Sequence, residues 1–156
     1  MADVVDAATR SRMMAAIRGK DTKPEMLIRR ALHARGLRYR LHDPALPGKP
    51  DLVFPRYRAV LFVNGCFWHG HDCRYFKIPA TRTEFWTEKI NANRLRDERQ
   101  IMLLKKQGWR VMVIWECTVR DRTSFDQLTA TVHDWITNNQ APQTGAASIQ
   151  QVQDVH

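Results

Sequence analysis

The chain has 156 residues, 44% of them hydrophobic and 26% charged, which is typical of one globular domain with a proper core. No apolar run approaches the roughly 18 residues of a membrane span, and the N-terminus lacks the basic and then apolar pattern of a signal peptide, so we expect a cytoplasmic protein. Residues 1–137 carry all 25 Lys and Arg against 15 Asp and Glu. This excess favours a polyanion such as nucleic acid as the partner, with plain solubility as the alternative.

Apolar residues at helical spacing predict a short helix over residues 8–17 and a second helix over 23–35, with Thr22 as its N-cap. A short strand is predicted over 37–41. Pro, Gly and Asp are frequent in residues 42–50, which predicts a loop.

The second half of the chain continues the alternation of strands and helices. Two apolar runs, 51–54 and 59–63, predict a hairpin in the main sheet. A long helix over 84–107, a buried strand over 109–115 and a helix capped by Ser124 follow. This order predicts an α/β domain over residues 1–137, with a small mixed sheet flanked by helices. The Gln-, Asn- and Ala-rich residues 138–156 predict a disordered polar tail.

Residues 66–73, with the sequence CFWHGHDC, combine thiols, imidazoles and large aromatic rings. Three cysteines without an export signal argue against a disulfide framework. Cys66, Cys73 and Cys117 together with His71 supply the closed tetrahedral shell of a structural zinc site. Two alternatives stay open: Cys117 is a buried core thiol, or His69 is the nitrogen ligand.

Two further side chains are candidates for chemistry. If His71 binds zinc, His69 is free to accept a proton from water; otherwise it is a loop histidine bonded to a backbone carbonyl. Asp51 opens a buried strand, where a carboxylate is costly unless it is paired or binds a cation such as magnesium. A turn-capping aspartate is the alternative. Phe67 and Trp68, beside these ligands on a basic protein, suggest rings held for stacking on bases.

Several long and compositionally unusual strings make the chain similar to the very-short-patch repair (Vsr) endonucleases. They are Ala8-Thr-Arg-Ser11, Leu46-Pro-Gly48 with Pro50-Asp51, Gly65-Cys-Phe-Trp-His69, Pro79-Ala-Thr-Arg-Thr-Glu-Phe-Trp86, Glu88-Lys-Ile90 and Gly108-Trp-Arg-Val111 with Trp115-Glu-Cys117. Pro50-Asp51 before a hairpin also resembles the first half of the PD-(D/E)xK nuclease motif, whereas residues 62–65 hold neither the acid nor the lysine of its second half. The resemblance implies a restriction-endonuclease-like core with a structural zinc site.

The resemblance also implies an activity. Vsr enzymes are strand-specific DNA endonucleases that nick 5′ of the thymine in a T:G mismatch, which arises when 5-methylcytosine is deaminated. Structural Zn²⁺, catalytic Mg²⁺, a monomeric state, MutL as a partner and a functional link to a cytosine-5 DNA methyltransferase are implied as well. The alternatives are a restriction-type nuclease of the same superfamily and a non-catalytic, zinc-stabilised DNA-binding module.

Residue roles carry over by position. Asp51 and the backbone carbonyl of Val63 would bind magnesium, and His69 would be the general base. Asn93 and Asp97, four apart on the long helix, would hold metal-bound waters, with Glu25 as an auxiliary acid. The zinc ligands would be Cys66, His71, Cys73 and Cys117.

The remaining implied roles are contacts to DNA. Phe67, Trp68 and Trp86 would enter the base stack beside the mismatch, although Trp86 would otherwise read as a core-packing helix residue. Further contacts near the mismatch or to phosphates would come from Met14, Lys89, Arg10, Arg12, Arg18, Arg82 and Arg94. Position 64 is Asn where the family has His, so the role of a second histidine does not carry over.

Overall fold

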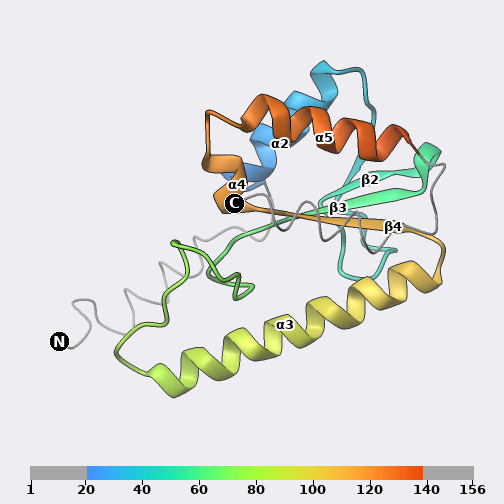
Figure 1. Cartoon of the computed structure of the whole chain (residues 1–156). Helices are drawn as coiled ribbons and strands as arrows, with labels where there is room; N and C mark the ends of the chain where they lie inside the picture. The colour runs from blue at the N-terminus through green and yellow to red at the C-terminus, as the bar shows by residue number, and fades with distance from the viewer. Residues whose placement is uncertain (1–20, 139–156) are drawn as a thin grey trace.

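The computed structural model describes residues 21–138, in which helices cover both faces of one four-stranded sheet (Figure 1). This arrangement confirms the predicted α/β class with a small mixed sheet. The predicted helix over 8–17 and the predicted tail over 138–156 lie outside the described residues, apart from Asn138. Arg10, Arg12, Met14 and Arg18 lie outside them as well.

The sheet has the strand order β1-β2-β3-β4. Its strands are β1 (Arg40–Leu41), β2 (Leu52–Phe54), β3 (Ala59–Asn64) and β4 (Arg110–Trp115). The first three strands are antiparallel, and β3 and β4 are parallel. The predicted hairpin is confirmed, whereas the strand predicted over 37–41 is only two residues long. Because β3 and β4 run in parallel, their carboxyl ends meet at one edge of the sheet.

Three longer helices flank the sheet: α2 (Lys23–Ala34), α3 (Thr83–Lys106) and α5 (Phe125–Thr137). Thr22 caps α2 as predicted, since its hydroxyl accepts a hydrogen bond from the Glu25 N–H at 3.4 Å. Ser124 is at the N-cap of α5 as predicted, but its side chain makes no capping hydrogen bond. A short helix, α4 (Glu116–Arg120), was not predicted; the Thr118 hydroxyl bonds back to the Trp115 carbonyl and holds its first turn.

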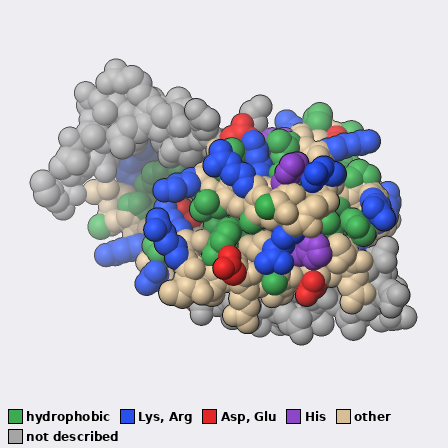
Figure 2. Space-filling model, turned by 90° about the horizontal axis from the view of Figure 1, so that it is seen from above, with side chains coloured by type: hydrophobic (Ala, Val, Ile, Leu, Met, Phe, Trp, Pro, Cys, Tyr) green, Lys and Arg blue, Asp and Glu red, His purple; other side chains and the backbone are tan. Residues whose placement is uncertain are grey.

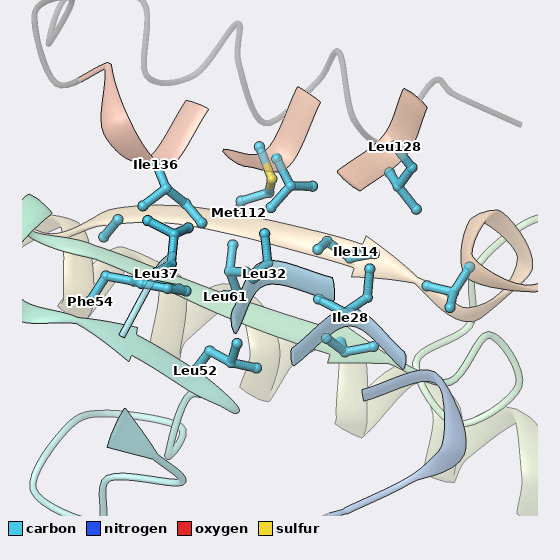
Figure 3. Close-up of a cluster of buried hydrophobic side chains, with 14 residues drawn as sticks. Ile28, Leu32, Leu37, Leu52, Phe54, Leu61, Met112, Ile114, Leu128 and Ile136 are labelled. Carbon is cyan, nitrogen blue, oxygen red and sulfur yellow. The ribbon is translucent and has the colours of Figure 1, made fainter. Parts of the chain in front are cut away.

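Side chains that alternate along the strands divide the core into two layers. Leu61, Met112 and Ile114 face α2 and α5, and Figure 3 shows them meeting Ile28 and Leu128. Val60 and Val111 point to the opposite face, where they pack with Leu104 of α3. The sheet is therefore buried on both faces, and the packing of Leu104 fixes the position of α3 relative to the strand ends.

Basic side chains are spread over the surface. Seen from above, on the side of α2 and α5, Lys and Arg side chains surround the face, with few acids among them (Figure 2). None of the helices in the described range 21–138 has both the length and the apolar character needed to cross a membrane.

Candidate active site

A cleft of about 580 Å³ lies where the carboxyl end of β3 meets the β1–β2 loop and the middle of α3. Asp51, Val63, His69 and Asp97, four of the predicted site residues, line it. They come from four different segments of the chain. The fold therefore brings together residues that the sequence separates by up to 46 positions, counted from Asp51 to Asp97.

Asp51 stands immediately before β2, with its carboxylate against the end of β3. The Val63 N–H donates to Asp51 Oδ2 at 2.7 Å, and the side chain is 14% exposed. Burial, reinforced by the nearby Glu25 carboxylate, raises the pKa of Asp51 to about 8, although the Val63 hydrogen bond opposes this shift. A buried carboxylate in such surroundings is favoured in its ionised form by a bound cation, and its hard oxygen atoms fit Mg²⁺.

Glu25, predicted as an auxiliary acid, is only 1% exposed and belongs to a network of charged groups. It accepts hydrogen bonds from Arg29 at 3.0 Å and from the Asp21 N–H at 3.1 Å. Its two oxygens also lie 3.0 and 2.9 Å from His42 Nε2. That nitrogen is 3.8 Å from Asp51 Oδ1, so His42 lies beside both carboxyl groups, while Glu25 also acts on Asp51 directly.

Sequence reasoning missed His42. It was assigned to a loop because it opens a run of turn residues, and nothing local distinguishes it from a solvated histidine. The missed signal is the pairing of β1 with β2, which places residue 42 opposite Asp51: the His42 N–H donates to the Asp51 carbonyl at 3.2 Å.

His69 is oriented by Asp97. Its Nδ1 lies 2.5 Å from Asp97 Oδ2, with both side chains about one quarter exposed. An ionised carboxylate can only accept, so the proton resides on Nδ1 and the neutral ring presents Nε2 as an acceptor. This is the tautomer that a general base needs.

Asn93, predicted with Asp97 to hold metal-bound waters, contacts the loop through its side-chain amide. Its Nδ2 donates to the Trp68 carbonyl at 2.8 Å. The next residue, Arg94, donates from its guanidinium to the Gly70 carbonyl. With Asp97 on His69, this turn of α3 contacts three consecutive loop residues. The role of Asn93 and Asp97 toward bound water stays a prediction.

The ligand atoms of Cys66, His71, Cys73 and Cys117 all lie within 4.8 Å of one another. Cys117 Sγ is 3.6 Å from His71 Nδ1, and burial raises the pKa of the Cys66 and Cys117 thiols. The His71 ring is stacked on Trp115 at 4.2 Å. Three sulfurs and one imidazole nitrogen at this spacing fit a tetrahedral Zn²⁺, which would favour the thiolates. Neither alternative matches this geometry, since Cys117 joins the cluster and His69 faces Asp97 instead.

Aromatic rings gather beside the cluster. The ring centres of Phe67 and Trp68 lie 5.5 and 5.9 Å from that of Trp86, which stands in the first turn of α3. Phe76 and Phe85, which the sequence analysis did not single out, border the same group. Trp86 is half-buried and packs on the other rings, not in the main core.

The predicted basic contacts surround these rings. Arg82 is exposed at the N-cap of α3, with its guanidinium 4.3 Å from the centre of the Phe85 ring. Lys89 is half-buried one turn after Trp86 on α3. Arg94 lies over Phe76, 5.8 Å from the ring centre.

Comparisons with known proteins agree with this geometry. The family described as DNA mismatch endonuclease Vsr matches residues 2–75. The chain is 50% identical over 138 residues to the DNA mismatch endonuclease Vsr of Escherichia coli (strain K12), covering 87% of this chain and 88% of that protein. It is 49% identical to the type II nicking enzyme V.XorIIP of Xanthomonas oryzae pv. oryzae, covering 78% of this chain and 89% of the relative. Identity to the type II nicking enzyme V.NmeAIP of Neisseria meningitidis is 43%, over 78% and 87% of the two chains.

Gly70 gives a test of how the loop is held. Its φ of +64° is left-handed, and a Cβ there would overlap the Arg94 guanidinium. We expect Gly70→Ala to lower the free energy of unfolding by about 1–2 kcal/mol from backbone conformation alone, with a further loss from the clash. Urea unfolding followed by circular dichroism measures both. Arg94→Ala should remove the clash, so an equal loss in both backgrounds would contradict this packing.

Proposed function

Because the chain belongs to the Vsr family of DNA mismatch endonucleases, we propose that it nicks one DNA strand on the 5′ side of the thymine in a T:G mismatch. The observation that carries the proposal is the arrangement of one cleft: an imidazole oriented by Asp97 and a buried Asp51 carboxylate line it, beside a group of aromatic rings. The relatives named as nicking enzymes support cleavage of a single strand.

Asp51 and the Val63 carbonyl would hold Mg²⁺, which would neutralise charge developing on the phosphate and on the leaving 3′ oxygen. His69 takes the proton from the attacking water through Nε2, because Asp97 occupies Nδ1. The water oxygen forms the new bond to phosphorus as the bond to the 3′ oxygen breaks. The products are a 3′ hydroxyl, which takes its proton from solvent, and a 5′ phosphate.

Recognition of the mismatch falls to the aromatic rings. Inserting Phe67, Trp68 and Trp86 beside a base pair costs a few kcal/mol of lost stacking per step. A wobble T:G pair is easier to distort than a normal pair, so the same rings discriminate through deformation energy. Arg82 and Arg94 lie over rings of this group, and with Lys89 of α3 they supply contacts to the phosphates.

A zinc ion at the four-residue cluster would hold this machinery in place. Cys66 precedes Phe67, Trp68 and His69, and His71 and Cys73 follow them. The zinc ligands therefore lie on both sides, along the chain, of the aromatic residues Phe67 and Trp68 and of the general base His69. The surrounding fold is, in this proposal, the restriction-endonuclease-like core without the acid and lysine of the usual motif.

The wider setting follows from the same family membership. We propose that the protein acts as a cytoplasmic monomer, that MutL is a partner, and that a cytosine-5 DNA methyltransferase defines the sequence around the mismatch. These proposals concern assembly and context, and the cleavage chemistry does not depend on them.

The central test is an end-labelled duplex with one T:G pair, incubated with Mg²⁺ or EDTA. Wild-type protein should nick only the thymine strand and only with Mg²⁺. Since a general base contributes about 10²–10⁴-fold, His69→Ala should slow nicking by that factor, and Asp51→Ala should abolish it. Cleavage of fully paired duplex would favour a restriction-type nuclease. Tight mismatch binding without a nick would favour the non-catalytic module.

Zinc content separates the two histidines of the loop. His71→Ala should lose the tightly bound zinc and melt at lower temperature, because the four-ligand shell is broken. His69→Ala, a matched change two residues away, should keep it. A chelator-based colorimetric assay on purified protein measures the metal. Retention of zinc by His71→Ala together with its loss by His69→Ala would reverse the assignment.

The role of the aromatic rings Phe67, Trp68 and Trp86 is tested by measuring DNA binding in EDTA, where no cleavage occurs. Base stacking is worth about 1–3 kcal/mol per base, so Trp86→Ala should weaken binding of a T:G duplex by that amount. Trp86→Phe keeps a ring and should retain most of the affinity. Equal weakening toward matched and mismatched duplexes would show that Trp86 does not discriminate.

A further inference from the structure

The backbone at His42 is unusual. His42 has a φ of +47°, in the left-handed region that residues with a Cβ seldom occupy. It closes the mouth of the β1–β2 loop, where its N–H bonds to the Asp51 carbonyl. Strain of this kind persists only where the surroundings enforce it, and it concentrates at functional sites. Its side chain lines the same cleft as Asp51 and His69.

The contacts of Glu25 define the direction of the hydrogen bond to His42. Glu25 already accepts from the Arg29 guanidinium and from the Asp21 N–H, so it acts as an ionised acceptor. His42 Nε2, 2.9 and 3.0 Å from the two Glu25 oxygens, must therefore carry the hydrogen. The ring is thus held by a buried carboxylate, which is itself held by two donors.

This nitrogen lies beside two carboxyl groups, those of Glu25 and Asp51. It is 2.9 Å from Glu25 and 3.8 Å from Asp51 Oδ1. The two carboxyl groups also act on each other directly, since the nearby Glu25 adds to the effect of burial in raising the pKa of Asp51. Asp51 has its other oxygen, Oδ2, fixed by the Val63 N–H at 2.7 Å. The His42 contact is therefore made to the other oxygen of Asp51, Oδ1.

We propose that His42 is a positioning residue of the cleft: its Nε2–H holds the buried Glu25 beside Asp51, and its ring, packed against Asp51 Oδ1, sets the Asp51 carboxyl group for a divalent cation. The inference rests on the proposed function for the role of that cation. It also gives the cleft a second imidazole in a chain whose position 64, on the same cleft wall, is Asn.

The matched pair His42→Gln and His42→Asn tests the geometry of this contact. Both variants carry an amide, but the Gln nitrogen reaches the position of Nε2, whereas the Asn nitrogen reaches only that of Nδ1. The probe is Mn²⁺, whose binding to the zinc-loaded full chain is followed by electron paramagnetic resonance without DNA. Exposed His33 on α2, changed to Gln, is the control for the loss of an imidazole elsewhere.

We expect His42→Gln and His33→Gln to bind Mn²⁺ with nearly wild-type affinity. His42→Asn should bind it about tenfold or more weakly, as is usual when the group that orients a metal ligand is lost, and should nick a T:G duplex more slowly at limiting Mg²⁺. Equal affinity in the Gln and Asn variants, whether both normal or both reduced, would overturn the proposal.

A second measurement does not depend on how well the variants fold. Long-range nitrogen–proton NMR spectra of wild-type protein should show His42 Nε2 carrying a hydrogen, and a bare Nε2 would overturn the proposal. If the variants show the expected order of Mn²⁺ affinities but the wild-type protein leaves T:G duplexes uncut, the proposed function is refuted and the role of His42 is not.

Discussion

The parallel register of β3 and β4 is the constraint on which the site depends. Asn64 pairs with Trp115 at the last rung of the ladder. Two residues beyond each partner stand Cys66 and Cys117, and the Cys117 N–H reaches the Cys66 sulfur at 3.4 Å. The pairing of two buried strands thus brings together thiols that are far apart in sequence, and His71 and Cys73 then fold back onto them. A slip of one residue would turn these side chains to opposite faces.

The loop between the thiols is held from its other side by α3. Asn93, Arg94 and Asp97 contact residues 68, 70 and 69 of the loop. These contacts fix the loop backbone and the His69 ring, so the aromatic side chains and His69 keep constant positions relative to one another. Because α3 is positioned by packing against the sheet, the positions of the residues in the cleft depend on the core as well as on the loop.

The elements with strong periodicity were predictable, because α2, α5 and the three longer strands have apolar patterns that agree with their packing. The long helix α3 has little apolar periodicity and was predictable from the acidic residue in its first turn and the basic residues in its last. The short helix α4 was not, since five residues carry too little pattern. The four-residue cluster could be inferred from residue chemistry. His42 could not, because its role arises from Glu25 on α2 and from a strand pairing, and both are long-range. Ser124 stands at the N-cap position but makes no capping hydrogen bond, because its backbone, with φ −109° and ψ 6°, is not in the extended conformation of a typical N-cap.

The cysteine–histidine cluster joins the middle of the chain to a residue that follows the last strand. During translation, a nascent chain therefore lacks its fourth ligand until Cys117 has left the ribosome. Until then the segment with the aromatic rings and His69 lacks a complete set of four metal ligands. A truncated product that ends before this point would carry the residues of the cleft without the means to assemble them.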